Sequence, residues 1–546
     1  MKVEAVFDDI RNVTFEEYLS KLGVENTEEF LKFRTVENDL DYDNIEDAVE
    51  LLKKYKNKKI LILCDVDVDG LLSSGELCDF LTKLGYDVDL IIHDKNPKAH
   101  GLDDSDVMKR ILEYEPSLLI IPDAGSMDNK PCKKLKNKGW ECIVLDHHDA
   151  SEEKKNTNAV LVNNQLSDRV KNKAGSGTLV TWHFMHLINP KLANEYISYV
   201  AISIISDGMS FLTNENITFI YRGLKDIHSN IKPFVDEIQN DYFPLSFTFG
   251  IIPKCNATIR LGTFEDKQKL YDYFAGRYDN VDNLVAMVKQ YHTKQNSESI
   301  RLLDEVNIDD EEQNVLLCKL NEKTPLTGLV ANKLMSKTGK PIFMLHDRVD
   351  GRCEGSVRSP VDIKDILNDS GIFNYNDGHQ AAFGTSYNLE DEETIKDYLY
   401  HMTLPEPHTD VFYSQGINTL SESEIGLFEE YRALFGNNLK EPLYHIKRFT
   451  INADEIDIIG KNKTTIRIKY GNWTIIKFFC SREWLEENEI RRVDGEGNYC
   501  LTHKELRVEF VGKLAWNEWM GKYYPQFKVE DMEIVKDFNP FERNNK

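Results

Sequence analysis

Residues 59–70 constrain the fold more than any other stretch of the chain. They read Lys-Ile-Leu-Ile-Leu-Cys-Asp-Val-Asp-Val-Asp-Gly. The apolar run before the first carboxylate is typical of a parallel strand buried on both faces, and Gly70 permits a sharp turn into a helix expected over residues 71–84. Parallel strands bind ligands at their carboxyl ends. The sequence therefore predicts a cation site formed by three carboxylates at alternate positions, Asp65, Asp67 and Asp69.

A calcium-binding loop is an alternative interpretation of the same residues. Asp-x-Asp-x-Asp-Gly also opens an EF-hand loop, and Glu76 stands where such a loop has its last ligand. An EF-hand loop, however, follows a helix and stays open through its second half. Here a strand leads in and a helical pattern begins at once. The context therefore favours a metal site at the end of a strand.

Strand and helix patterns alternate from Lys58 to residue 145. This alternation predicts an α/β fold with a doubly wound parallel sheet. The expected strands cover residues 60–64, 87–93, 118–122 and 141–145, and the expected helices cover residues 71–84, 104–114 and 129–138.

Two further strand ends carry residues of metal-ligand types. Asp123 follows the third expected strand, and Asp146-His147-His148-Asp149 follows the fourth. A histidine pair flanked by aspartates at a strand end favours ligands over surface histidines. Further along, an apolar helix ends at Asp207. The helix dipole disfavours a carboxylate at this end, and a nearby dication would offset that cost.

Composition limits the class of protein. The chain has 546 residues, is 41% hydrophobic and carries a formal charge of −25, which argues against binding a polyanion over its whole surface but allows a local basic groove. No apolar run is long enough to span a membrane and the N-terminus shows no signal pattern, so we expect a cytoplasmic protein with no membrane partner. Nine cysteines without a Cys-x-x-Cys pair favour neither a zinc ribbon nor a disulfide framework.

The candidate ligands resemble the motifs of a known family. Asp65-Val-Asp-Val-Asp-Gly, Asp123, Asp146-His-His and Asp207 are similar to the four motifs of the DHH phosphoesterase superfamily, and the chain resembles its RecJ branch from about residue 58 to about residue 535. The resemblance implies a doubly wound parallel sheet, a connecting helix, a second α/β lobe and a C-terminal OB-type β-barrel. The later segments that carry it are residues 249–262, 355–359, 378–384 and 506–521.

The sequence departs from the family pattern at a few positions. Ala99-His100-Gly101 stands where the family has Gly-Tyr-Gly, and the arginine that usually precedes it is missing. Asp377 replaces the first glycine of the family's Gly-Gly-His turn, and Phe383 replaces a small residue. These departures bear on substrate contacts and not on the metal site.

The resemblance implies two divalent ions, and oxygen ligands with imidazole suit Mn²⁺ first, with Mg²⁺ as the alternative. It implies that Asp69, His147 and Asp207 hold one ion, that Asp67 with Asp65 holds the other, and that Asp123 bridges them. Asp146 is expected to orient an imidazole, and His148 to donate to the phosphate. The expected catalytic residues are Asp123, His147 and His148.

Substrate contacts are expected in the helical connector, the second lobe and the barrel. Arginine forks bind phosphate oxygens in pairs, and a Gly-Ser turn adds backbone donors. Aromatic side chains of the barrel could stack bases, although most should be core. The expected phosphate-binding residues are Asn256, Arg260, Ser356, Arg358 and His379. The candidate stacking residues are Trp473, Phe478, Phe479, Trp516, Trp519 and Tyr523.

The expected domains follow from these patterns. They are an N-terminal helical segment at 1–55, the DHH domain at 56–215, a helical connector at 216–310, the DHH-associated substrate-binding domain at 311–410, a linker at 411–440 and an OB-fold domain at 441–546.

The leading functional hypothesis is a single-strand-specific DNA exonuclease, working from the 5′ end, that acts in DNA repair, recombination or replication. We expect a monomer whose partners are single-stranded DNA and, as protein candidates, a single-strand-binding protein or a helicase. The alternative is a phosphodiesterase of short oligonucleotides or cyclic dinucleotides on the same metal site. A binding protein with a defunct nuclease core is a third hypothesis, against which the complete metal motifs argue.

Overall fold

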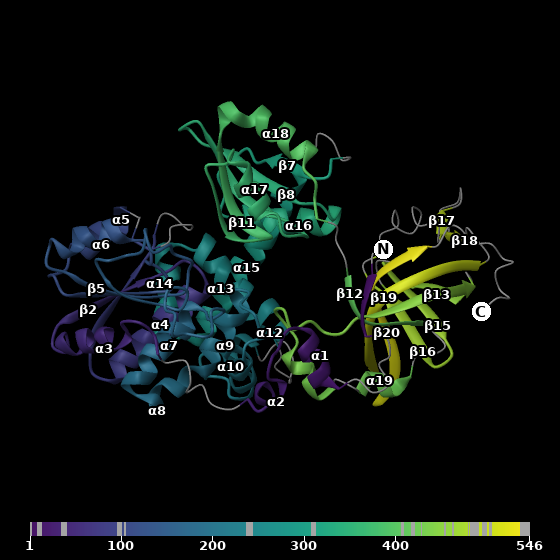
Figure 1. Ribbon diagram of the computed structural model, residues 1–546, viewed down its shortest axis with the longest axis horizontal. Helices are drawn as coiled ribbons and strands as arrows, with labels where there is room; N and C mark the ends of the chain where they lie inside the picture. The colour runs from purple at the N-terminus through teal and green to yellow at the C-terminus, as the bar shows by residue number, and fades with distance from the viewer. Residues whose placement is uncertain are drawn as a thin grey trace. The chain divides into compact units, whose positions relative to one another are not determined.

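The computed structural model (Figure 1) resolves most of the chain into two compact units. The larger unit consists of residues 29–407 with 436–438, and the smaller unit consists of residues 1–28, 408–435 and 439–546. The residues that the structure describes are 3–7, 14–33, 41–94, 101–102, 105–235, 244–306, 313–405, 409–416, 421–426, 429–452, 455–460, 464–478, 480, 491–493, 499–501 and 505–534. No helix among them is long and apolar enough to cross a membrane.

The larger unit begins with a parallel five-stranded sheet in the order β3-β2-β4-β5-β6. The chain order reverses beside β2, which is the point where ligands bind in such sheets. The expected doubly wound sheet is therefore confirmed, with a fifth strand added at one edge. Its strands are β2 (Lys59–Cys64), β3 (Asp87–Ile92), β4 (Leu118–Pro122), β5 (Glu141–Asp146) and β6 (Val160–Asn163).

Helices cover both faces of this sheet (Figure 1). On one face, α5 (Ser105–Ile111) and α6 (Asn129–Lys136) share a hydrophobic core with the strands through residues such as Leu61, Ile111 and Leu135. The other face carries α3 (Ile45–Lys54), α4 (Val68–Lys83) and α7 (Gly177–Ile188). With both faces covered, the central strands β2, β4 and β5 are largely apolar, which explains the unbroken apolar runs in the sequence.

Helix α4 begins earlier than the sequence pattern suggested. The expected start was residue 71, but the first helical residue is Val68. Asp67 is the N-cap, and its side chain accepts a hydrogen bond of 2.9 Å from the backbone N–H of Gly70. An N-cap aspartate satisfies a backbone donor that the helix leaves unpaired. Asp69 therefore lies in the first helical turn rather than in a loop.

A helical region follows the first sheet. It includes α9 (Ile197–Ser206), α10 (Asn214–Lys225), α13 (Ile251–Leu261), α14 (Phe264–Phe274) and the long α15 (Val281–Asp304). Shorter helices in the same region are α8 (Pro190–Ala193), η1 (Asn194–Tyr196), α11 (Lys232–Val235) and α12 (Pro244–Phe249). The 24 residues of α15 supply the long connecting helix that the sequence predicted.

The second sheet of the larger unit has five strands in the order β10-β11-β9-β8-β7. Only the β7–β8 pair is parallel, and the other pairs are antiparallel. Its elements are β7 (Leu316–Lys319), α16 (Thr327–Thr338), β8 (Ile342–Asp347), β9 (Arg352–Arg358), α17 (Lys364–Ser370), β10 (Tyr375–His379), β11 (Ala382–Asn388), η2 (Leu389–Asp391) and α18 (Glu392–His401).

The smaller unit is built on an eight-stranded sheet in the order β1-β12-β13-β19-β20-β16-β15-β14. A separate two-stranded ribbon joins β17 (Arg491–Val493) to β18 (Tyr499–Leu501). The main sheet consists of β1 (Val3–Phe7), β12 (Thr409–Gly416), β13 (Tyr444–Asn452), β14 (Ile456–Ile459), β15 (Thr465–Tyr470), β16 (Trp473–Lys477), β19 (Glu505–Trp519) and β20 (Lys522–Ile534). Short helical segments of this unit are α1 (Phe15–Lys21), α19 (Glu422–Gly426) and η4 (Glu429–Leu434), while α2 (Thr27–Phe30) spans the boundary between the two units in the chain.

Two segments of this unit differ from the expectation. Residues 3–7, expected in a helical segment, form β1, and the segment expected as a linker from 411 lies partly in β12. The two strands pair in parallel, with Val3 opposite Thr409. A strand whose partner lies some 400 residues away leaves no local signal beyond the alternation of Val3-Glu-Ala-Val-Phe7.

Candidate metal centre

Three strand ends and one helix end bring the predicted ligands together. The Nε2 atom of His147 lies 3.2 Å from Asp123 Oδ1, 3.5 Å from Asp207 Oδ2 and 3.7 Å from Asp69 Oδ2. Asp123 follows β4, His147 follows β5 and Asp207 caps α9. Ligand atoms of Asp69, His147 and Asp207 all lie within 4.8 Å of one another, which is close enough to share one cation.

A second group of potential ligands adjoins the first. Asp65, Asp67 and Asp123 offer carboxylate oxygens that also lie within 4.8 Å of one another. Asp65 and Asp123 are almost fully buried. Since Asp123 belongs to this group and also lies beside His147, it stands between the two positions.

Asp123 itself has the environment of a ligand. Its backbone has a φ of 62°, a left-handed conformation that few residues other than glycine and asparagine adopt without strain. Both carboxylate oxygens are buried, and among the described residues neither accepts a hydrogen bond. A buried carboxylate without donors is costly unless a cation compensates it, so these atoms fit a metal.

The negative charges of the clustered carboxylates repel one another. Burial, followed by the charges of Asp69 and Asp67, raises the pKa of Asp123 well above its ordinary value. Burial and the charge of Asp69 likewise raise the pKa of Asp207. Crowded carboxylates hold protons more tightly because they cannot all ionise together. Bound dications would remove this repulsion.

The N-terminus of α7 positions Asp69, a contact that sequence reasoning missed. The backbone N–H groups of Gly177 and Thr178 donate to the two oxygens of Asp69 at 2.7 and 2.8 Å. The first turn of a helix favours a carboxylate through unpaired N–H groups and the helix dipole. The run Gly175-Ser-Gly-Thr178 before an apolar stretch was the available signal, since Ser176 is the N-cap of α7.

Asp146 contacts both histidines, the backbone of His147 and the backbone and ring of His148. It accepts hydrogen bonds from the backbone N–H groups of Ser126 (2.9 Å), His147 (2.7 Å) and His148 (3.2 Å). Its Oδ1 also lies 2.8 Å from Nδ1 of His148. Burial works against a charged His148, but the Asp146 carboxylate outweighs it and raises the pKa of His148 to about 10. The half-exposed His148 ring is therefore protonated at neutral pH.

The pKa of His147 shifts in the opposite direction to that of His148. Burial and the neighbouring positive His148 lower its pKa. A neutral imidazole is the form that binds metals. The ring also makes a hydrogen bond to the backbone of Gly175, in the loop that precedes α7. A fixed partner on one ring nitrogen leaves the other free for a ligand role.

Two arginines, Arg260 and Arg358, are predicted from the sequence to bind phosphate. Arg260 lies in the last turn of α13, Arg358 ends β9, and both are half-buried. Burial lowers the pKa of Arg358, and the positive charge of Arg260 lowers it further. Neither guanidinium forms an ion pair within the described part of the chain, where the one hydrogen bond of Arg358 goes to the carbonyl of Val357 at 2.7 Å. Two neighbouring cations without a carboxylate partner fit an anion.

Other predicted substrate residues surround these arginines. Asn256 lies on α13, and its Oδ1 is buried without a donor from any described residue. Ser356 Oγ lies 2.8 Å from the Oγ1 of Thr327, in the first turn of α16. Gly355 and Ser356 form part of strand β9 and not the turn that was expected. A side chain on Gly355 would collide with the carbonyl of Met344, so the close approach of β8 requires this glycine.

The positions that depart from the family pattern lie in different surroundings. Ala99 and His100 lie outside the described residues, while the N–H of Gly101 donates to Asp65 Oδ1 at 3.3 Å. Asp377 is exposed in β10, and Phe383 is buried in the core of the second lobe. His379 ends β10, but its side chain is outside the described part of the structure.

The candidate base-stacking residues differ in how far their rings are exposed. Trp473 is buried, Trp516 is half-buried, and Phe478 and Tyr523 are 45% and 64% exposed. Phe479 and the side chain of Trp519 lie outside the described residues. Only the exposed rings can stack on a base.

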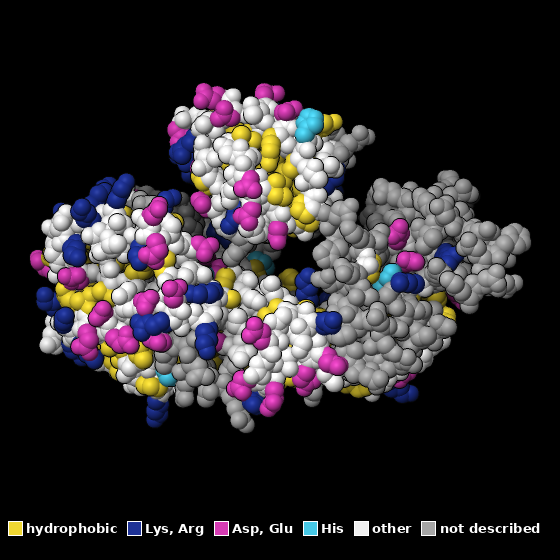
Figure 2. Space-filling model, in the orientation of Figure 1, with side chains coloured by type: hydrophobic (Ala, Val, Ile, Leu, Met, Phe, Trp, Pro, Cys, Tyr) yellow, Lys and Arg dark blue, Asp and Glu magenta, His cyan; other side chains and the backbone are white. Residues whose placement is uncertain are grey.

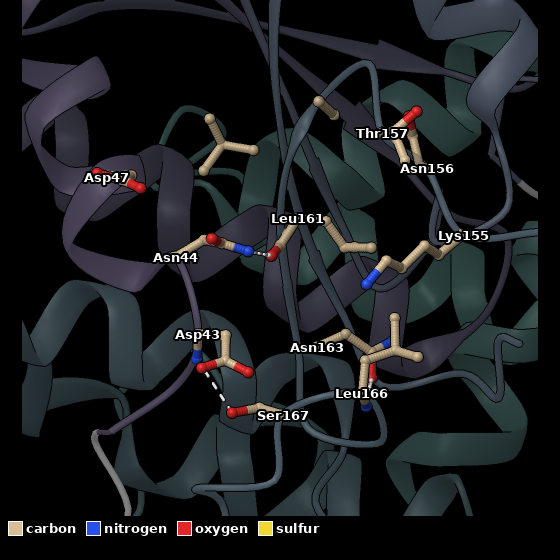
Figure 3. Close-up of a pocket in the computed structure, with 12 residues that line it drawn as sticks. Asp43, Asn44, Asp47, Lys155, Asn156, Thr157, Leu161, Asn163, Leu166 and Ser167 are labelled. Carbon is tan, nitrogen blue, oxygen red and sulfur yellow. Dashed lines mark hydrogen bonds between the residues drawn. The ribbon is translucent and has the colours of Figure 1, made fainter. Parts of the chain in front are cut away.

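A cavity of about 290 Å³ lies elsewhere, between α3 and β6 (Figure 3). Figure 3 shows Asp43, Asn44 and Lys155 among its lining. Asn163 also lines it and donates to the carbonyl of His148 at 3.0 Å. This cavity contains none of the clustered ligands and is separate from the metal centre.

Comparison with known proteins agrees with the fold. The N-terminal domain of the DHH family matches residues 59–204, and the RecJ OB domain matches residues 417–531. The putative SPbeta prophage-derived single-strand DNA-specific exonuclease YorK of Bacillus subtilis (strain 168) is 26% identical over 541 residues, covering 90% of this chain and 91% of that protein. The single-stranded-DNA-specific exonuclease RecJ of the same organism is 23% identical over 525 residues, covering 90% of this chain and 63% of RecJ.

A solved structure has the same fold. The crystal structure of RecJ in complex with Mn²⁺ from Thermus thermophilus gives a TM-score of 0.71 at 20% identity, covering 97% of this chain and 79% of that one. The parallel sheet with ligands at its strand ends defines a DHH-type phosphoesterase fold. Residues 59–204 therefore match a DHH domain and residues 417–531 a RecJ OB domain, and the chain as a whole is similar to RecJ-like proteins.

Proposed function

We propose that this protein is a divalent-metal-dependent exonuclease that degrades single-stranded DNA from its 5′ end and releases mononucleotides. The observation that carries the proposal is the pair of adjoining ligand groups that meet at Asp123 and His147. Relatives named as single-strand DNA-specific exonucleases support the choice of substrate.

The donor set fits two hard divalent ions, with Mn²⁺ preferred and Mg²⁺ as the alternative. Asp69, His147 and Asp207 would hold one ion, Asp65 and Asp67 the other, and Asp123 would contact both. When bound, such ions neutralise phosphate charge and lower the pKa of a coordinated water. The protein itself contributes the orphaned oxygens of Asp123 and the hydrogen bonds that fix Asp69 and His147.

His148 is proposed as the proton donor. Water adds to the phosphorus and releases a proton to the solvent, the P–O3′ bond breaks, and the 3′ oxygen of the departing terminal nucleotide receives a proton. The half-exposed, protonated ring of His148 is suited to give that proton, and Asp146 holds it in place. The shortened strand keeps a phosphate on its new 5′ end, so each cycle regenerates the same kind of substrate.

The arginines are proposed to read that 5′-phosphate. Arg358 and Ser356 lie on β9 beside the first turn of α16, where Gly328 leaves room for the guanidinium. Helix N-termini favour phosphate, and guanidinium forks bind it in pairs. Arg260, whose charge acts on both Asp67 and Arg358, would hold the strand between the metals and the terminal phosphate.

The smaller unit is proposed to bind the rest of the strand through exposed aromatic rings such as Tyr523. Acidic and basic side chains are interspersed on the face of the larger unit seen in Figure 2, so whole-surface attraction to DNA does not explain binding. Cytoplasmic location, action as a monomer, and a single-strand-binding protein or helicase as partner remain parts of the same proposal.

The test is an assay with Mn²⁺ on single strands labelled at the 5′ or the 3′ end, on duplexes and on cyclic dinucleotides. Early mononucleotides from the 5′ end of single strands alone are expected. Equal degradation of duplexes, or release of 3′-terminal nucleotides first, would overturn the proposal. Cyclic dinucleotides or dinucleotides as preferred substrates would instead favour a phosphodiesterase of small nucleotides.

A further inference from the structure

The segment that carries Asp207 is fixed from a distant part of the chain. The side chain of Asn437 donates to the carbonyls of Ile204 and Ile205, at 3.3 Å each, in the last turn of α9. Its own backbone carbonyl accepts from the N–H of Phe211 at 2.9 Å. Asn437 therefore contacts the chain on both sides of Asp207, at carbonyls that also accept from the backbone N–H groups of Met209 and Gly208.

A second asparagine joins this segment to the loop before α7. Asn216 is fully buried in α10, and its side-chain N–H groups donate to the carbonyl of Ser210 at 2.7 Å and to that of Ala174 at 2.8 Å. Its oxygen accepts from Asn172 at 2.8 Å. One amide thus uses both donors and its acceptor to connect residues 172–174 with residue 210.

The loop on the far side of Asn216 positions the other members of the first ligand group. Gly175 makes the hydrogen bond to the ring of His147, and Gly177 and Thr178 donate to Asp69. Ser176 Oγ in the same loop lies 2.7 Å from Ser203 Oγ on α9, so the loop and the helix of Asp207 are also joined directly. No contact of this kind connects Asn216 to the Asp65–Asp67 turn within the described residues.

We propose that Asn216 is a positioning residue that sets the separation of Asp207 from Asp69 and His147. It thereby sets the affinity of the metal position that these three residues form. Asn437 supports Asp207 alone. The inference rests on the proposed metal-dependent function. The position formed by Asp65, Asp67 and Asp123 is expected to respond less. Within the described residues, none of its carboxylates accepts a hydrogen bond from Asn216 or from residues 175–178, and only the packing of Gly177 against Asp123 reaches it. Groups that orient metal ligands through hydrogen bonds commonly change metal affinity by about 10–100-fold when lost.

The experiment measures Mn²⁺ binding to the metal-stripped full-length protein by calorimetry, together with its unfolding temperature without metal. The variants are Asn216→Asp, which keeps the size of the side chain but loses both donors, and Asn437→Ala. The control is Thr218→Val, because Thr218 is also buried in α10 but its hydroxyl bonds only within the helix, to Asn214.

The wild type should bind two ions. Asn216→Asp should weaken one of them by about 10-fold or more and leave the other within about 2-fold. Asn437→Ala should weaken the same ion by a smaller factor, and Thr218→Val should change neither, even if its unfolding temperature falls. If Asn216→Asp does not fold, Asn437→Ala provides the same selective readout.

Three results would overturn the inference. If the wild type binds two ions and both asparagine variants bind them unchanged, the inference is overturned but the proposed function stands. Equal weakening of both ions would do the same, because it would show a general loss of structure. A wild type that binds no divalent ion would overturn the proposed function as well.

Discussion

A side chain on Gly177 would collide with the carboxylate of Asp123, since a Cβ there would lie 2.3 Å from Asp123 Oδ1. The first turn of α7 can therefore approach the metal centre only because residue 177 is glycine. The same residue donates its N–H to Asp69 at 2.7 Å. One position in the chain thus serves two ligands, through the absence of a side chain and through its backbone.

Gly177→Ala should abolish most hydrolysis, although alanine favours a helix by about 1 kcal/mol over glycine. The added methyl group pushes α7 away from Asp123 and lengthens the contacts to Asp69. Activity in Mn²⁺ should fall about 100-fold or more, measured as the initial rate on a single strand. Gly426→Ala is the control, because Gly426 has nothing within 4 Å of the added atom. Similar rates for both variants would show that α7 does not position the ligands.

Asp123→Asn should abolish hydrolysis and stabilise the metal-free protein. Asparagine preserves the shape and tolerates the left-handed backbone, whereas alanine would add about 1–2 kcal/mol of strain. Burial and neighbouring carboxylates raise the pKa of Asp123, so the folded wild type loses stability as pH rises above the ordinary pKa of 3.8. The asparagine variant lacks this loss, and its advantage should grow between about pH 4 and pH 8.

Denaturant unfolding without metal at pH 5 and pH 8, with rates in Mn²⁺, checks this prediction. Turnover within about tenfold of the wild type would contradict the bridging role of Asp123. A metal-free variant less stable than the wild type at pH 8 would contradict the charge argument.

Glu76→Met should also stabilise the protein. Glu76 is fully buried in α4, and within the described residues neither of its oxygens has a hydrogen-bond partner. Burial, and then the charge of Asp69, raises its pKa well above the ordinary value of 4.5. Wild-type stability therefore falls as pH rises above that value, and the methionine variant should gain about 1–3 kcal/mol at pH 8 and less at pH 5.

The measurement is the free energy of unfolding in urea at both pH values, without metal. Glu46→Met is the matched control, since Glu46 is exposed in the first turn of α3 and should change stability by less than about 1 kcal/mol. A destabilised Glu76→Met protein would show that the carboxylate has a partner that methionine cannot replace.

Asp146→Asn should move the alkaline limit of activity to lower pH. The carboxylate of Asp146 holds the pKa of His148 at about 10, and an amide would let that pKa fall toward its ordinary value of 6.5. If protonated His148 donates the proton, the wild type should stay active at pH 9 while the variant loses activity above about pH 7. Rates in Mg²⁺ from pH 6 to pH 9 test this, with His148→Gln as a control whose low rate should not follow this titration.

The parallel sheet and the clustering of the candidate ligands could be predicted because each depends on a local pattern. Asp65, Asp123 and His147 directly follow apolar strands, and strand ends meet at one edge of a parallel sheet. Contacts made by backbone groups gave weaker signals. The hydrogen bond from the backbone N–H of Gly177 to Asp69 joins residues 108 positions apart. A run of glycine and serine occurs in many other structural contexts, so it does not by itself predict this contact.

The support of Asp207 by Asn437 left no sequence signal at all. Asn437 stands in a segment that reads as a linker, and its role depends on where the chain returns after the second lobe. The strand β1 was missed for the same reason, because its partner is formed by residues at 409–413. Tertiary partners decide the structure where the local pattern allows more than one state.

The last prediction concerns the 5′ end of the substrate. Arg358→Ala should erase most of the preference for a 5′-phosphate over a 5′-hydroxyl, because a terminal phosphate carries more charge than an internal one and Arg358 has no carboxylate partner within the described residues. A charge-assisted contact worth roughly 1.5–3 kcal/mol corresponds to a rise of about 10–150-fold in KM for the phosphorylated strand, with kcat little changed.

Arg352→Ala is the matched control on the same strand. Arg352 is paired with Asp350 at 2.7 Å, and a surface pair of this kind contributes little. Paired assays on 5′-phosphate and 5′-hydroxyl single strands should therefore separate the two variants, with the preference lost only in Arg358→Ala. If the Arg358→Ala enzyme kept the wild-type preference, the terminal phosphate would have to be read at another site, and the proximity of Arg358 to Arg260 would serve the internal phosphates instead.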